Sequence, residues 1–108
     1  MKPGKTGITR IVDATGYSFG GIRSAWKNEA AFRQEATLAL IGVPLALLLA
    51  RSASDFLFLT LPLLLLMLAE LANSAIEAVV DRLGDDPDEL SGRAKDMGSA
   101  MVFMAILI

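Results

Sequence analysis

The feature that most constrains this chain is an uncharged segment that runs directly into a row of polar residues. Residues 56–69 carry no charged side chain, and Glu70 follows at once. At about 100° per residue, a helix places three polar residues within about 60° of this carboxylate: Asn73, Glu77 and Asp81. Apolar residues cover the other sides. The pattern predicts an apolar helix with one polar stripe, which is costly to bury unless its groups find partners.

Composition narrows both the fold class and the chemistry. Hydrophobic residues make up 54% of the 108 residues, which favours a single membrane domain over a soluble bundle. The chain contains neither Cys nor His. Disulfides, thiolate chemistry, an imidazole base and the usual zinc sites are therefore excluded. Carboxylates, Lys, Arg and hydroxyls remain, and a bound metal would be an oxygen-preferring ion such as Mg²⁺.

The N-terminal part of the chain has the pattern of a helix that lies on a surface. Over residues 8–27 the large apolar side chains return to one helical face, and most charged residues lie off it. Gly16, Gly20 and Gly21 each weaken such a helix by about 1 kcal/mol relative to Ala, so we expect a break or bend there. The apolar segments that follow favour contact with a membrane surface over packing on a soluble core.

Three further segments are predicted to be membrane-spanning helices, which makes the expected fold an all-α membrane protein. They cover residues 29–50, 55–82 and 91–108. A polar turn over residues 51–55 should make the first two spans antiparallel, and an acidic turn over residues 84–89 should lead to the third. Ser91 is the expected N-cap of the last helix.

The first of these spans is uncharged over only 15 residues, from Ala36 to Ala50. That length covers about 22 Å, whereas the hydrocarbon core of a membrane is about 30 Å thick. We therefore expect the helix to begin near Glu29, with Arg33 and Glu35 facing the interior of a helix bundle or reaching the interface.

The basic residues are distributed unevenly along the chain. Six of the ten lie before the uncharged stretch of the first span, three lie between residues 82 and 95, and only Arg51 lies in the first turn. By the positive-inside tendency, the N-terminus and the loop before the third span are cytoplasmic. Glu29, Glu77 and Lys95 are then expected at the same cytoplasmic depth.

This convergence of polar groups indicates phosphoryl chemistry at a membrane surface. A carboxylate inside a span costs roughly 2.5–3.5 kcal/mol on insertion scales, so Glu70 is a candidate general base rather than a hydrogen-bonding post between helices. Glu29 and Glu77 come from different helices and can together hold one Mg²⁺ with room for phosphate oxygens. Lys95, next to Asp96, can bind phosphate. Taken singly, Glu29 would be read as a solvated acid and Lys95 as an interfacial lysine.

Three stretches of the sequence carry a more specific signal. They read Asn-Glu-Ala-Ala-Phe-Arg-Gln-Glu from Asn28, Glu-Leu-Ala-Asn-Ser-Ala-Ile-Glu-Ala-Val-Val-Asp from Glu70, and Glu-Leu-Ser-Gly-Arg-Ala-Lys-Asp-Met-Gly-Ser-Ala from Glu89. In this order and spacing they resemble the motifs of the small prokaryotic integral-membrane diacylglycerol kinases, and the likeness runs from Gly7 to Ala100.

The resemblance implies a homotrimer in the bacterial inner membrane, with composite active sites at the cytoplasmic interface. Such an enzyme uses MgATP to phosphorylate diacylglycerol to phosphatidic acid. Its partners would be diacylglycerol, ATP, membrane lipid and other copies of the chain, and no nucleic acid is expected.

The resemblance also implies roles for individual residues. The implied catalytic residues are Glu70 as base toward the lipid hydroxyl, supported by Asn73, Lys95 and Asp96. The residues implied to bind MgATP are Arg10, Tyr17, Gly21, Glu29, Glu77, Lys95 and Asp96. Of these, Glu29 and Glu77 are the implied metal ligands.

Alternative functions stay open on the sequence alone. An undecaprenol kinase would have the same architecture, although the Ser-Gly-Arg-Ala-Lys-Asp form of the third motif favours diacylglycerol. A small proton-coupled transporter would use Glu70 as its proton carrier, but it would leave Glu29, Glu77 and Lys95 without a joint purpose. A purely structural membrane subunit explains the spans and nothing else.

Overall fold

The computed structural model of the chain describes residues 6–84 and 89–108. These residues form four α-helices and no strand, in the order α1 (Gly7–Asn28), α2 (Ala30–Leu49), α3 (Ala53–Arg82) and α4 (Glu89–Leu107). The predicted all-α class is confirmed. The centre of the predicted acidic turn, residues 85–88, lies outside the described residues.

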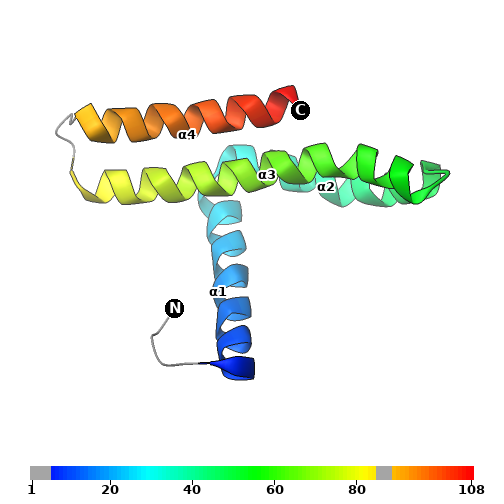
Figure 1. Cartoon of the computed structure of the whole chain (residues 1–108), viewed down its shortest axis with the longest axis horizontal. Helices are drawn as coiled ribbons and strands as arrows, with labels where there is room; N and C mark the ends of the chain where they lie inside the picture. Colours follow the sequence, from blue (N-terminus) through cyan, green and yellow to red (C-terminus); the bar gives the residue numbers. More distant parts are fainter. Residues whose placement is uncertain (1–5, 85–88) are drawn as a thin grey trace.

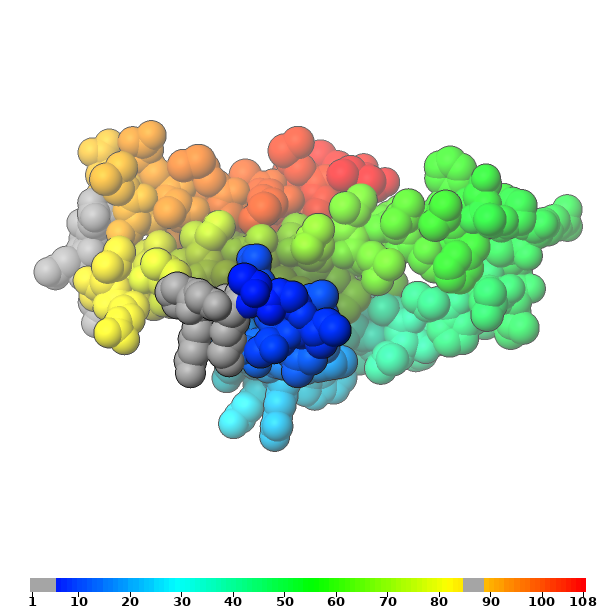
Figure 2. Space-filling model, turned by 60° about the horizontal axis from the view of Figure 1, so that its bottom comes forward, coloured from blue at the N-terminus to red at the C-terminus, as the bar shows by residue number. Residues whose placement is uncertain are grey.

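α3 is the central helix of the molecule. α2 runs antiparallel along its N-terminal half, and α4 runs antiparallel along its C-terminal half (Figure 1). In the described parts of the chain, α2 and α4 do not contact each other. α1 meets α2 and α3 at its C-terminal end and projects away from the other three helices in a different direction (Figure 1). In Figure 2, α1 projects from the middle of the molecule. The turn between α2 and α3 lies to one side of it, and the C-terminal end of α3 lies to the other.

The change of direction between α1 and α2 takes place at Glu29. This residue has extended backbone angles, φ −118° and ψ 109°, and so interrupts the helix. The half-buried Arg33 donates from Nη1 to the carbonyl oxygens of Trp26 and Lys27, at 2.9 and 3.1 Å. The last carbonyls of a helix lack partners within it and favour a cation nearby. Arg33 therefore stabilises the end of α1 and holds Glu29 where the two helices meet.

α1 continues through its central glycines, so the predicted break at these positions is wrong. Gly16, Gly20 and Gly21 all have negative φ angles. A glycine in a helix costs about 1 kcal/mol relative to Ala, whereas an interruption would leave backbone N–H and C=O groups without helical partners. In the same region the hydroxyls of Thr15 and Ser18 donate to carbonyl oxygens one turn earlier, at 2.8 and 2.9 Å.

Two helix starts differ from the predicted ones. α3 begins at Ala53, because Ser52 Oγ accepts a hydrogen bond from the backbone N–H of Asp55 at 3.1 Å and acts as the N-cap. α4 begins at Glu89, so the prediction that Ser91 caps this helix is wrong. Glu89 lies in the first turn, where a carboxylate stabilises the positive end of the helix dipole.

α2 and α3 are each long and apolar enough to cross a membrane, by length and composition. Within the described residues α4 does not meet the same criterion. Its first half carries Arg93, Lys95 and Asp96, and a twelve-residue uncharged stretch follows from Met97 to Ile108. Two candidate spans are thus found where three were predicted.

The packing between the helices uses small side chains. Among the described residues, the buried hydrophobic ones are four alanines, Ala25, Ala46, Ala69 and Ala105, together with Phe32. Large apolar side chains point outward instead, as for Leu48 and Phe58, which are both 81% exposed in the single chain. Small residues allow close approach of helices in a membrane, and an apolar exterior is stable next to lipid or another subunit.

Candidate active site

A pocket of about 740 Å³ lies between α1 and α3, next to the elbow at Glu29. α1 lines it with small and polar residues, among them Gly21, Ser24 and Asn28. α3 lines it with residues that include Glu77 and Asp81. The pocket therefore brings together the two predicted metal ligands, Glu29 and Glu77, which are far apart in the sequence.

The polar residues of α3 lie along one side of the helix, as the spacing predicts, but they meet different neighbours. Asn73 Nδ2 donates to Glu77 Oε1 at 3.1 Å, and both side chains are partly buried. Glu77 and Asp81 face the pocket. Glu70 lies outside the pocket lining and close to Glu35 of α2. The stripe thus connects the pocket to a carboxyl pair further along α3.

Glu35 was expected from the sequence to face the interior of a helix bundle or to reach the interface, but no catalytic role was assigned to it. Its carboxyl group lies close to that of Glu70. The sequence contained a signal for this proximity: Glu35 directly precedes the uncharged segment 36–50, and Glu70 directly follows the uncharged segment 56–69. The two acids meet because α2 and α3 are antiparallel (Figure 1).

Lys95 reaches the edge of the pocket from α4. Its Nζ forms an ion pair with Asp81 Oδ1 at 2.8 Å, and Asp81 itself lines the pocket. The side chains are 47% and 66% exposed, so the pair contributes little to stability. The ion pair does, however, keep the ammonium group of Lys95 beside the pocket that Glu29 and Glu77 line. Asp81 belonged to the predicted stripe, but no role was assigned to it.

Asp96 is not brought to this pocket. It is exposed and lies two positions before Gly98, which is buried against α3. Two residues correspond to about 200° around a helix, so Asp96 faces away from α3 of the same chain.

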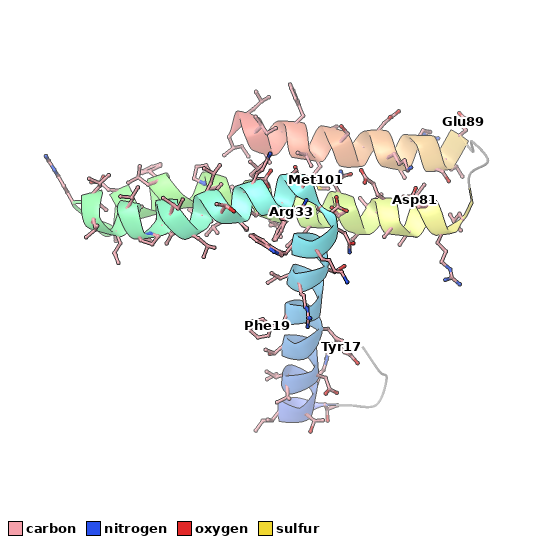
Figure 3. All side chains as sticks on the ribbon, turned by 180° about the vertical axis from the view of Figure 1, so that it is seen from behind. Tyr17, Phe19, Arg33, Asp81, Glu89 and Met101 are labelled. Carbon is pink, nitrogen blue, oxygen red and sulfur yellow. The ribbon has the colours of Figure 1, made fainter. Side chains whose placement is uncertain are left out.

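Arg10 and Tyr17 share a stripe of α1 with Gly21, but only Gly21 lines the pocket. Arg10 and Tyr17 are exposed further out along the helix. Tyr17 projects toward the side of the C-terminal end of α3, and Phe19 projects toward the opposite side (Figure 3). α1 thus presents a polar and an apolar face in opposite directions.

The residues of the pocket fit a magnesium ion held jointly with a substrate. Over the described ranges, no three Asp, Glu, Cys or His side chains form a complete metal site. Mg²⁺, however, is commonly bound by only one or two carboxylates together with substrate phosphates and water. Glu29 and Glu77 supply two carboxylates, and the Oε2 atom of Glu77 is not engaged by Asn73.

Comparison with known proteins shows the family of the chain. Residues 16–108 match the family described as prokaryotic diacylglycerol kinase. The chain is 53% identical over 108 residues to the diacylglycerol kinase of Escherichia coli K12, covering 100% of this chain and 88% of that protein. Identity to the diacylglycerol kinase of Haemophilus influenzae is 50% over 103 residues, covering 95% and 87% of the two chains. For that of Pseudomonas aeruginosa it is 46% over 105 residues, covering 97% and 85%. The chain therefore belongs to the prokaryotic diacylglycerol kinase family.

Proposed function

We propose that this protein is a membrane-bound kinase that transfers the γ-phosphate of ATP to the hydroxyl of diacylglycerol and yields phosphatidic acid. Membership of the family and the names of the relatives support the reaction and favour diacylglycerol over undecaprenol as acceptor. One observation of this structure carries the proposal. Glu70 lies at the boundary between the uncharged half of α3 and the half that lines the pocket.

This boundary suits a reaction between a lipid and a nucleotide. The acyl chains of diacylglycerol would lie along the uncharged part of α3, which places its hydroxyl near Glu70. A nucleotide is polar and would enter the pocket between α1 and α3. Glu77 lies seven residues beyond Glu70, about 10 Å along the helix axis. The two substrates therefore approach the same carboxylate from opposite directions.

In the proposed step, the lipid hydroxyl oxygen attacks the γ-phosphorus while Glu70 accepts its proton. The bond between the γ-phosphorus and the oxygen that bridges to the β-phosphate breaks, and ADP leaves with that electron pair. Glu35 lies close to Glu70 and, when it is ionised, would give the abstracted proton a second acceptor. The pair can thus return Glu70 to its basic form after each turnover.

The remaining site residues would position the phosphates. Glu29 and Glu77 would hold Mg²⁺, which neutralises charge on the phosphate oxygens when it is bound. Asn73 holds Glu77 through its hydrogen bond, and Lys95 would exchange Asp81 for a phosphate oxygen. Three residues of α1, Arg10, Tyr17 and Gly21, would contact the nucleotide from the polar face of that helix.

We further propose that α2, α3 and α4 all span the bacterial inner membrane and that three copies assemble into a trimer. The opposite polar and apolar faces of α1 suit a helix that lies on the cytoplasmic surface (Figure 3). The basic residues concentrated at that level support this orientation. The outward-facing apolar side chains offer surface to lipid and to other copies. Asp96, which faces away from its own α3, would serve the site of a neighbouring subunit.

The test is transfer of labelled γ-phosphate from MgATP to dioleoylglycerol and, separately, to undecaprenol in detergent micelles. We expect label in phosphatidic acid, and its loss by a factor of roughly 10² to 10⁴ in Glu70→Gln. Glu89→Gln, an exposed acid at the start of α4, is the matched control and should retain the wild-type rate.

Other outcomes of this assay would contradict parts of the proposal. Label on undecaprenol alone would replace the acceptor and keep the phosphoryl chemistry. Equal rates in Glu70→Gln and the wild type would remove Glu70 from its role as base. Absence of label on either lipid, in a protein that is folded and trimeric, would contradict the kinase and favour a proton-coupled transporter.

A further inference from the structure

Gly98 of α4 is packed directly against the polar stripe of α3. A Cβ atom at this position would collide with Asn73 Oδ1 and lie 3.2 Å from Asn73 Cγ. The other glycines within the described helices that have helical φ angles are Gly16, Gly20, Gly21, Gly42 and Gly92, and a Cβ added to any of them would meet nothing within 4 Å. Gly98 is therefore the position where the absence of a side chain makes room for a residue of the site.

The orientation of the Asn73 amide explains what this space is for. Nδ2 donates to Glu77 Oε1 at 3.1 Å, whereas Oδ1 is buried and has no hydrogen-bond partner among the described residues. The flipped amide would set Oδ1 against a carboxylate oxygen and would lose the hydrogen bond. Oδ1 must therefore face α4, where the Cα–H group of Gly98 is its neighbour and can act as a weak donor.

We propose that Gly98 is a positioning residue for Asn73 and, through Asn73, for the carboxylate of Glu77. It acts by leaving open the space that Oδ1 occupies, which keeps Nδ2 directed at Glu77. The inference rests on the proposed function of Glu77 as a magnesium ligand. It adds a residue of α4 to a site whose metal ligands come from the α1–α2 elbow and α3.

The geometry separates this role from a general packing role. The clash that a Cβ would create falls on the end of the Asn73 side chain, whereas the nearest backbone atom, Asn73 Cα, is 3.8 Å away and in ordinary contact. α3 and α4 can therefore keep their separation if Asn73 rotates. Rotation removes the hydrogen bond to Glu77, so Gly98→Ala should affect the site more than the fold.

The experiment compares Gly98→Ala with Gly92→Ala on the same helix. Both changes add one Cβ to α4 and raise helix propensity equally. The measured quantity is the phosphorylation rate as a function of free Mg²⁺ at saturating ATP and diacylglycerol. We expect Gly98→Ala to raise the Mg²⁺ concentration at half-maximal rate about tenfold, since partners that orient a metal ligand typically affect metal affinity by 10- to 100-fold. The KM for diacylglycerol should be unchanged, and Gly92→Ala should match the wild type.

A double-mutant cycle tests whether the effect passes through Asn73. In the Asn73→Ala background, Gly98→Ala should cause no further change in Mg²⁺ requirement or in unfolding by sodium dodecyl sulfate in mixed micelles. A wild-type Mg²⁺ requirement in folded Gly98→Ala would overturn the proposal. So would a rise in Mg²⁺ requirement on Gly98→Ala that is the same in the wild-type and the Asn73→Ala backgrounds. If Gly98→Ala fails to fold, recovery of folding by Asn73→Ala supports the contact and continued failure contradicts it.

The cycle also distinguishes this proposal from the function on which it rests. If Glu77→Ala leaves the Mg²⁺ requirement unchanged, Glu77 is not a metal ligand. The unfolding measurements still report whether Gly98 and Asn73 are coupled, because they do not depend on catalysis.

Discussion

The two halves of α3 have the same backbone geometry and opposite chemistry. From Phe56 to Ala69 no side chain is charged, and the buried Thr60 donates to the carbonyl oxygen of Phe56 in its own helix at 2.8 Å. From Glu70 onward, Asn73 donates to Glu77 and Asp81 pairs with Lys95 of α4, while Glu70 lies close to Glu35 of α2. In the first half, the Thr60 hydroxyl finds its hydrogen-bond partner within α3 itself. In the second half, the polar side chains of α3 have charged neighbours on other helices.

The comparison shows that the neighbours of a helix decide how its polar residues are used. α2 covers the N-terminal half with apolar residues, and the surface left over suits lipid chains. The C-terminal half is approached by α1, α2 and α4, each of which contributes a charged or polar residue. One continuous helix thus links a lipid-facing surface to a polar pocket, with Glu70 at the junction.

After that of Glu70→Gln, the largest effect is expected at the centre of the polar half. Glu77→Ala should lower the phosphorylation rate about 100-fold or more, because even the loss of a group that only orients a metal ligand costs 10- to 100-fold. The measurement is kcat at increasing Mg²⁺, and high Mg²⁺ should restore part of the rate. A wild-type Mg²⁺ dependence in this variant would show that the pocket acids are structural.

A smaller effect is expected at the edge of the pocket. Lys95→Met should raise the KM for ATP roughly tenfold, which corresponds to about 1.4 kcal/mol, because a charge-assisted contact to phosphate is lost. Arg93→Met, which removes a nearby exposed cation from the same helix, is the control and should leave the KM close to wild type. Equal changes in both variants would indicate a general effect of positive charge rather than a specific contact.

The smallest effect is expected in the apolar half. Thr60→Val removes one hydroxyl that bonds within its own helix, so the free energy of unfolding should change by less than about 1 kcal/mol. The phosphorylation rate should remain that of the wild type. A large loss of rate without loss of folded protein would break the comparison, because it would place the chemistry in both halves of α3.

Parts of the site followed from periodicity and depth. The 3.6-residue period places Asn73 and Glu77 on one side of α3, and their hydrogen bond agrees with this. Counting residues along the predicted spans put Glu29 and Glu77 at one level, and both line one pocket. The roles of these residues in metal binding and catalysis stay predictions.

Other parts needed the contacts between helices. The pairing of Glu35 with Glu70 depends on how α2 and α3 lie against each other, and the ion pair of Asp81 with Lys95 depends on α4. The predicted break in α1 was wrong because propensity sums do not include the cost of interrupting a helix. The N-cap at Ser91 was wrong because helix starts depend on a few tenths of a kcal/mol to about 1 kcal/mol per residue.

The sequence by itself determined the all-α class, the apolar segments and the polar stripe of α3, because these depend on local spacing and on the cost of placing charge in an apolar helix. The tertiary structure decided which stripe residues face the pocket, which carboxyl group pairs with Glu70, and that Gly98 makes room for Asn73. These features depend on helix directions and separations of a few ångströms. Residues distant in the sequence set such distances jointly, so no local pattern encodes them.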